Sequence, residues 1–157
     1  MGLDMYLKAS KYVSGYSFSN GDDKSLYSKL LDAVGLALKD IDKDTPSGEI
    51  SFTVAYWRKA NAIHAWFVRN CQDGKDECQH TYVERDKLTE LRDTIDRVLA
   101  DRGLASELLP TQSGFFFGGT DYDEWYWQDL ERTSKKLTRL LGDEGLNGWD
   151  FYYHSSW

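Results

Sequence analysis

The alternation of apolar and polar side chains predicts four strands. Apolar residues fill every second position from Leu3 to Leu7, which is typical of a strand with one buried face. The clearest alternation runs from Ile50 to Tyr56 and is rich in β-branched and aromatic side chains. A short extended piece at Thr81–Val83 and an alternating tail at Trp149–His154 complete the set. The aromatic tail is expected to be tied into the sheet, where His154 and Trp157 could flank the first strand, and its pairing partner stays open.

Apolar residues spaced three or four positions apart predict four helices. Their expected ranges are Lys24 to Lys39, Trp57 to Val68, Asp86 to Asp101 and Thr120 to about Gly142. The hydroxyl of Thr120 is expected to cap the last helix, with Asp123 in the capping-box position.

This order of elements predicts one α+β domain that spans residues 1–157. We expect a small, mostly antiparallel sheet with helices packed on one face. The hydrophobic content of 41% and the charged content of 29% are ordinary for a globular protein. A chain of 157 residues is long enough to bury a core of its own.

Aromatic residues are unusually frequent. They make up 15% of the chain, with 6 Trp, 10 Tyr and 7 Phe, which is more than a small core usually holds. We therefore expect several half-exposed rings, which favour a binding surface and leave self-association into a homo-oligomer open. The net charge of -7 argues against direct nucleic-acid binding, because affinity for a phosphate backbone comes largely from Lys and Arg.

The start of the chain and its hydropathy favour a cytoplasmic protein with no membrane partner. No apolar run approaches the roughly 20 residues that span a bilayer. The opening MGLDMYLKAS includes an acid and lacks the apolar core of a signal peptide. The sequence contains no nucleotide-binding loop or other cofactor motif, so no cofactor is expected.

The most unusual stretch runs from Leu108 to Glu131, where aromatic, acidic and glycine residues are concentrated. Its first part places Phe115, Phe116 and Phe117 between glycines, which predicts a short apolar strand or a tight loop. Apolar rings at such spacing usually fill the protein's own core, and we expect that role for the three phenylalanines.

The residues from Gly114 to Tyr126, here called the aromatic-acidic segment, are also a candidate binding surface. Helix capping needs only one or two acids, but several stand here beside a tyrosine and a tryptophan. Amphipathic aromatic side chains are favoured at binding sites. We therefore predict a binding site in this region that consists of Gln112, Ser113, Asp121, Tyr122, Asp123, Glu124 and Trp125.

A second candidate site lies on the predicted helix from Trp57 to Val68. Trp57, Asn61 and His64 fall on one helical face, and Arg58 lies three residues before Asn61. Their donors and the titratable imidazole suit a carboxylate, a phosphate or a peptide carbonyl. The alternative is structural, with Asn61 and His64 bridging to a neighbouring loop. No nucleophile with a paired base accompanies them, so no catalytic residue is assigned.

Cys71, Cys78 and His80, together with His64, could in principle supply soft ligands for zinc. The spacing of the two cysteines is too wide for the close pair that structural zinc sites use. A reduced thiol pair on an acidic loop is therefore expected, and no metal is assigned.

Four stretches of the sequence are distinctive as a set. They are the start MGLDMYL, the blocks YWRKANAIHAWFV and LLPTQSGFFFGGTDYDEWYWQDLE, and the tail WDFYYHSSW. Together they resemble a family of small uncharacterised proteins encoded by bacteriophages and prophages, and the resemblance covers nearly the whole chain. The family has no established catalytic signature, and small accessory phage proteins of this kind often modify or block a host system. The resemblance implies a genomic setting more than a mechanism.

Two classes of function follow. In the first, the chain is a binding protein in the cytoplasm of an infected bacterium, where it inhibits or modulates a host defence system. Its partner is a host protein or a small nucleotide signal, bound by the aromatic-acidic segment and by Arg58, Asn61 and His64. The net negative charge favours the protein partner.

A nucleotide partner and the second class of function each require a particular arrangement of side chains. A nucleotide needs stacking rings and positive charge, so Trp57, Arg58 and Lys59 would have to lie near Tyr122 or Trp125. The second class of function is a small hydrolase that uses His64 or Asp123 as a base, with Arg58 steadying an anion. It requires these groups to meet in one pocket.

Overall fold

The computed structural model describes residues 2–157. These residues form two compact units. The larger unit contains residues 2–9 and Thr53–Trp157, and the smaller unit contains Ser10–Phe52. Each unit has its own cluster of buried apolar side chains. The first two strands of the chain pass from one unit into the other.

The sheet is antiparallel and has four strands in the order β2-β1-β4-β3. The strands are β1 (Asp4–Ser14), β2 (Ser47–Arg58), β3 (Thr81–Val83) and β4 (Asp150–Ser156). The C-terminal strand β4 lies between β1 and β3, and Tyr82 of β3 stands opposite Tyr152 of β4. The prediction that the aromatic tail is tied into the sheet is confirmed, and the structure adds its two neighbours, β1 and β3.

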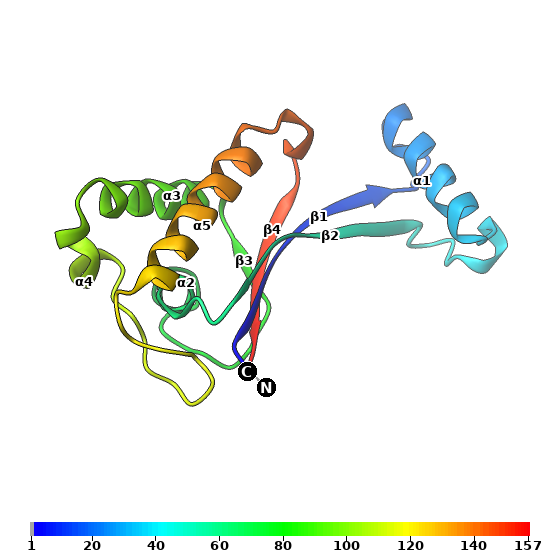
Figure 1. Cartoon of the computed structure of the whole chain (residues 1–157). Helices are drawn as coiled ribbons and strands as arrows, with labels where there is room; N and C mark the ends of the chain where they lie inside the picture. Colours follow the sequence, from blue (N-terminus) through cyan, green and yellow to red (C-terminus); the bar gives the residue numbers. More distant parts are fainter. Residues whose placement is uncertain (1) are drawn as a thin grey trace. The chain divides into compact units, whose positions relative to one another are not determined.

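The helices of residues 2–157 are α1 (Gly21–Val34), α2 (Asn61–Cys71), α3 (Arg85–Ala100), α4 (Ala105–Leu108) and α5 (Glu124–Gly142), with short 3-10 turns at Leu38–Asp40, Arg102–Leu104 and Glu144–Leu146. In the larger unit, α2, α3 and α5 lie on the same side of the sheet, and α3 packs against α5 (Figure 1). The predicted α+β class, a small antiparallel sheet with helices on one face, is confirmed. Within the same residues, no helix combines the length and the apolar character needed to cross a membrane.

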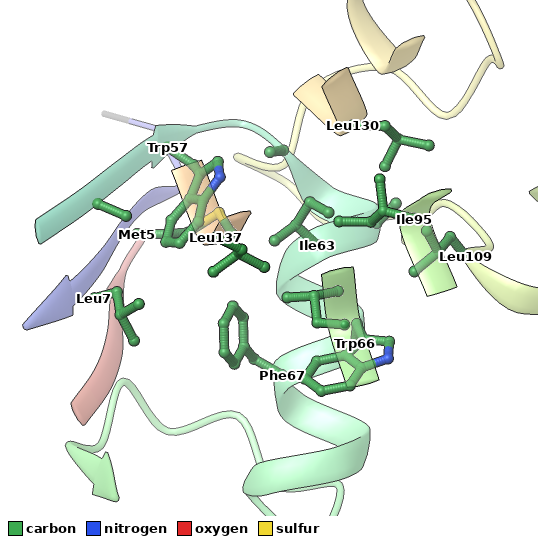
Figure 2. Close-up of a cluster of buried hydrophobic side chains, with 14 of the residues drawn as sticks. Met5, Leu7, Trp57, Ile63, Trp66, Phe67, Ile95, Leu109, Leu130 and Leu137 are labelled. Atoms are coloured by element: carbon green, nitrogen blue, oxygen red, sulfur yellow. The ribbon is translucent and has the colours of Figure 1, made fainter. Parts of the chain in front are cut away.

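The core of the larger unit lies between the sheet and these helices (Figure 2). Met5 and Leu7 of β1 point inward because alternate side chains of a strand share a face. Figure 2 shows them gathered with Phe67 of α2 and Leu137 of α5. Full burial of a side chain of this size stabilises the fold by roughly 1.5–3 kcal/mol. This layer therefore fixes α2 and α5, the two helices that border the candidate site.

The smaller unit is built around Val13, Tyr27 and Leu31, which are buried together. The side chain of Asn20 caps α1 by accepting a hydrogen bond from a backbone amide of the first turn. Gly35, with a backbone φ of 73°, ends the helix in the left-handed conformation. For this reason α1 ends before the predicted limit at Lys39.

The prediction of one helix from Trp57 to Val68 is wrong at its start. Strand β2 continues through Arg58, and α2 begins only at Asn61. Lys59, with a backbone φ of 58°, makes the turn between the two elements. Trp57 fits the two-residue period of the strand as well as the helical period, so the apolar pattern alone does not separate them.

Helix α5 begins at Glu124, later than the predicted start at Thr120. The carboxylate of Asp123 caps it and accepts a hydrogen bond from the backbone amide of Tyr126 at 3.1 Å. Thr120 lies before the helix, and its carbonyl oxygen accepts a hydrogen bond from the hydroxyl of Thr111 at 2.8 Å. Thr120 and Asp123 are both good capping residues, so the local rule does not choose between them.

Candidate functional site

A pocket of about 470 Å³ lies in the larger unit, between the start of α2 and the first turns of α5. Residues from the connecting segment Thr111–Asp121 complete its wall. Its volume is within the range of small-ligand sites, roughly 300–1,000 Å³. The pocket joins the two regions of the sequence that were predicted as separate candidate sites.

Asn61, at the start of α2, connects these two regions. Its side-chain amide donates to the carbonyl oxygens of Phe117 at 3.1 Å and Gly119 at 2.8 Å. Its side-chain oxygen accepts from the backbone amide of Gln112 at 3.1 Å. The side chain is buried and uses both of its polar groups. The predicted structural alternative, in which Asn61 bridges to a neighbouring loop, is confirmed.

One further bond fixes the same segment to the chain just before β1. The backbone amide of Leu3 donates to the carbonyl of Phe116 at 3.1 Å. Gly118 has a backbone φ of 88°, which residues with a side chain rarely adopt. The segment is therefore held at several points although it contains no helix or strand.

Lys59 lines the pocket beside this segment and has an unusual backbone. Its φ of 58° is left-handed, which costs a residue with a side chain about 1–2 kcal/mol. The conformation is held because its amide donates to the carbonyl of Leu3 at 2.8 Å and its carbonyl accepts from the amide of Asn61 at 2.9 Å. Backbone strain of this kind is often found at functional sites.

The aromatic-acidic segment holds large apolar side chains in solvent. Phe115 is 94% exposed, Trp125 is 71% exposed and Tyr122 is 38% exposed. Of the three phenylalanines that were expected in the core, only Phe117 is fully buried, while Phe116 is half-buried. The core prediction for Phe115 is wrong, since the turn that buries Phe117 directs Phe115 outward.

The wall of the pocket contains equal numbers of cationic and acidic side chains. The cations are Arg58, Lys59 and Arg132, and the acids are Asp121, Asp123 and Asp129. At neutral pH their formal charges cancel. The wall of the pocket is therefore neutral overall rather than positive, which matters for the class of ligand that it can hold.

Asp129 is the most unusual of these charged groups. Burial raises the pKa of its carboxyl to about 6, although Arg132 and Lys136 nearby act in the opposite direction. In residues 2–157 its carboxylate accepts no hydrogen bond and forms no ion pair, and its backbone carbonyl accepts from Thr133. A half-buried carboxyl without a direct partner costs stability, so it marks a group that is available for a ligand.

His64 lies outside the pocket, in the protein interior. Its side chain is fully buried. Nε2 lies 2.9 Å from a carboxylate oxygen of Asp76, and Nδ1 lies 2.7 Å from the hydroxyl of Tyr153. Because a carboxylate only accepts, Nε2 donates to Asp76; in the neutral imidazole, Nδ1 then accepts from the hydroxyl of Tyr153. The other oxygen of Asp76 accepts from the indole of Trp157 at 3.1 Å, so the imidazole ties the 72–80 loop to the C-terminus.

Trp57 is also buried rather than available to a ligand. Its indole nitrogen donates to the hydroxyl of Thr133 at 2.8 Å. The ammonium of Lys136 lies 5.3 Å from the centre of its ring. Trp57 therefore joins β2 to α5, and of the predicted donor group only Arg58 and Asn61 line the pocket.

The remaining predicted residues are spread around the pocket. Gln112 is half-buried and is bound through its backbone, whereas Ser113 is exposed. Glu124 is exposed and accepts from the side chain of Gln128 at 3.2 Å. The wall includes Asp121, Asp123 and Trp125 from the predicted set.

Asp129 and Arg132 were not predicted from the sequence, although a signal for them is present. Trp125, Asp129 and Arg132 are spaced by four and three residues, so they share one face of α5. This stripe combines a tryptophan with two opposite charges and lies beside the apolar stripe of the same helix. Such a pattern indicates that this face of α5 is a candidate for binding.

The two cysteines are free, and both are half-buried. Burial raises the pKa of the Cys71 thiol to about 11. A thiol with so high a pKa is a poor nucleophile at neutral pH. Within residues 2–157, no group of three or more His, Cys, Asp and Glu side chains is arranged to hold a metal ion.

Comparison with known proteins gives no match. No protein-family model matches the chain, and neither a curated protein nor a solved structure is significantly similar to it. The pocket and the side chains around it are therefore the features that a functional proposal has to explain.

Proposed function

We propose that this chain is a binding protein whose target is another protein, engaged through the aromatic-acidic segment and the adjoining pocket. The observation that supports this most is the exposure of Phe115 and Trp125, 94% and 71%, on a segment held by the buried side chain of Asn61. Apolar side chains that are already positioned lose little freedom when a partner covers them. Aromatic anchors of this kind dominate the energy of protein interfaces.

The charges around these anchors indicate a basic target. Asp121, Asp123 and Glu124 are exposed in the same segment. The chain as a whole has a net charge of -7. A positive surface on the target would complement these acids, speed up the encounter and help to exclude other partners.

The resemblance to phage-encoded accessory proteins supports a setting for this activity. In an infected bacterium, the chain would occupy a host protein and so inhibit or modulate a defence system. Binding alone would be sufficient for such a role, because covering a functional surface of the target blocks it without chemistry.

A nucleotide-type signal molecule is the second candidate, because one observation favours it. Arg58 and Lys59 line the pocket together with Trp125. This is the combination of cationic side chains and a stacking ring that a nucleotide requires. The three acids of the wall oppose it, since they cancel the positive charge that phosphates would need. We therefore place the protein target first.

No observation favours hydrolysis. Asp123 lines the pocket and caps α5, while His64 is fully buried and is not part of the wall. Both ring nitrogens of His64 are bound within the protein. The imidazole thus has no free nitrogen with which to act as a base.

Affinity purification tests the proposal. The tagged chain would be expressed in bacteria and purified under mild conditions, and the eluate would be analysed by native mass spectrometry before and after denaturation. We expect wild type to retain a bacterial protein in stoichiometric amount. The double variant Phe115→Ala, Trp125→Ala should lose it, because truncating two anchors removes most of the binding energy.

Tyr12→Ala is the matched control. Tyr12 is 58% exposed, and it belongs to the smaller unit, outside the candidate site. This control should retain the target as wild type does. Retention by the Phe115 and Trp125 double variant would rule out the proposed surface. A nucleotide released on denaturation, with no partner protein, would favour the second candidate instead.

A further inference from the structure

A row of aromatic rings crosses the face of the sheet that points away from the helices of the larger unit. It consists of Tyr56 of β2, Tyr6 of β1, His154 of β4 and His80 beside β3. The ring centres of neighbours are 5.3 Å apart for Tyr56 and Tyr6, 4.8 Å for Tyr6 and His154, and 4.2 Å for His154 and His80. None of these rings lines the pocket described above.

A second pair of rings stands next to this row. Tyr82 and Tyr152 are opposite each other on β3 and β4, with ring centres 5.7 Å apart. Tyr82 is 52% exposed and Tyr56 is 43% exposed. Among the described residues of the larger unit, the helices lie on the opposite side of the sheet (Figure 1). No described helix of the larger unit therefore covers this aromatic face.

The geometry of the rings argues against nucleic acid as the occupant. The rings of Tyr6 and His154 are inclined by only 13°, and those of His154 and His80 by 18°. The flat faces of these rings are therefore turned toward one another and are not open to a stacking base. A platform that stacks bases needs open ring faces together with a surplus of cations.

The charge of the face favours a second copy of the same chain. The charged side chains that alternate onto this face are Asp4, Lys8 and Asp150, whereas Arg58 at the end of β2 lines the pocket. The face therefore carries a net charge of only -1, whereas the chain carries a net charge of -7. The electrostatic repulsion between two copies is therefore weaker at this face than over the rest of their surfaces. Tyrosine is also enriched in the centre of protein interfaces.

The size of the face predicts how stable such a contact is. The four strands are spaced about 4.8 Å apart and average about five residues of 3.4 Å in the larger unit, so they cover a projected area of roughly 300 Å² per copy. Side-chain relief increases this value, yet it stays below the roughly 800 Å² per partner of a standard interface. A contact of this size is reversible and depends on the protein concentration.

We propose that the aromatic face is the interface of a reversible homodimer, in which the sheets of two copies pack face to face. The two-fold axis of such a dimer brings each residue of the face to the same surface of the partner copy. Two sheets packed in this way lie about 10 Å apart and enclose the rings between them. The proposal does not depend on the proposed function, because it uses a different face of the larger unit.

Sedimentation velocity over protein concentrations from about 10 μM to about 1 mM tests the dimer. Wild type should change from monomer to dimer within this range. Tyr82→Asp places a carboxylate within the interface in each copy, and it should raise the dissociation constant at least about tenfold. His80→Asp serves as a second variant with the same expected effect. Circular dichroism identifies which of the two is folded, and a folded variant decides the test.

Trp125→Asp is the control, because it adds the same charge at an exposed aromatic residue of the candidate site. It should dimerise as wild type does. Wild type that stays monomeric throughout, or a dimer that withstands both aspartate substitutions, would overturn the proposal. A dimer lost in Trp125→Asp would do the same. Binding of a single-stranded RNA oligonucleotide that Tyr82→Asp abolishes would identify a different occupant and also overturn it.

Discussion

Replacing Asn61 tests whether the candidate site is formed before a ligand arrives. The side chain is 5% exposed and bonds to the backbones of Phe117, Gly119 and Gln112. Asn61→Ala removes all three bonds. The residue Gly119 is exposed, so its carbonyl can turn to water, whereas Phe117 is buried. The loss of stability is therefore largest at the carbonyl of Phe117, which stays buried without a donor.

The expected magnitude follows from these three bonds. Each contributes a net of about 1 kcal/mol, and a buried group left without a partner costs about 1–3 kcal/mol. We expect Asn61→Ala to lower the free energy of unfolding by about 2–3 kcal/mol. For a chain of this length, the melting temperature should fall by roughly 5–10 °C. Asn61→Asp should be worse, because a carboxylate cannot donate to the carbonyls of Phe117 and Gly119.

Urea denaturation of wild type and both variants measures these differences. Hydrogen exchange adds a local measure, since amides in the 111–120 segment should exchange faster in Asn61→Ala than in wild type. The two results together separate a local release of the segment from general destabilisation. A loss below about 0.5 kcal/mol in Asn61→Ala, or an Asn61→Asp variant as stable as wild type, would refute the reasoning.

Three further predictions concern the groups around the site. Burial raises the pKa of Asp129 to about 6, so the folded state holds this proton more tightly than the unfolded chain does, and stability is lost as pH rises through that value. Asp129→Asn should therefore be more stable than wild type at about pH 7.5, by about 1 kcal/mol after allowance for solvent screening. At about pH 4 the two proteins should be equally stable. Urea titrations that give the same gain in stability at both pH values would contradict this prediction. Thermal denaturation should show that Lys59→Gly raises the free energy of unfolding by about 0.5–1 kcal/mol, because glycine relieves the strain of the left-handed backbone. In the same assay, Lys59→Ala should bring no gain. His64→Ala should lower stability by roughly 2–4 kcal/mol because it leaves a cavity and two unpaired partners, yet the folded fraction should bind its target with unchanged affinity in calorimetry; weaker binding without loss of stability would show that the imidazole is functional.

The strand pattern of the chain could be predicted where one face of the strand is buried. The alternation from Leu3 to Leu7 marked the start of β1, and the aromatic tail marked β4. The remainder of β1, up to Ser14, was missed because the alternation breaks where the neighbours Ala9 and Ser10 are both buried, and because Ser10 and Lys11 give no apolar signal. That part of the strand pairs through its backbone, which leaves no periodic trace in the side chains.

The position of His64 could not be predicted from helical periodicity. A surface helix is expected to have one polar face, and the polar residues Asn61 and His64 were placed on it. Helix α2 instead has every residue from Asn61 to Val68 buried. The loops and the C-terminus cover the side that would otherwise face solvent. The polar side chains of a helix buried all round must find partners inside the protein, as these two do.

The pocket itself depends on contacts between residues far apart in the sequence. Arg58 and Trp125 could each be proposed as site residues, but nothing in the local sequence places them on one wall. That placement follows from the turn at Lys59 and from the hydrogen bonds of Asn61. Long-range contacts of this kind leave no signal in a single sequence, so the candidate site could be predicted as residues but not as a pocket.

The measurement that tests the central claim most directly is hydrogen exchange of the chain with and without the bacterial protein that it captures. A target bound through the aromatic-acidic segment and the adjoining pocket should slow the exchange of amides in residues 111–126 and at the start of α2. The smaller unit, residues 10–52, should exchange as it does in the free chain. Protection confined to the smaller unit, with residues 111–126 unchanged, would contradict the account.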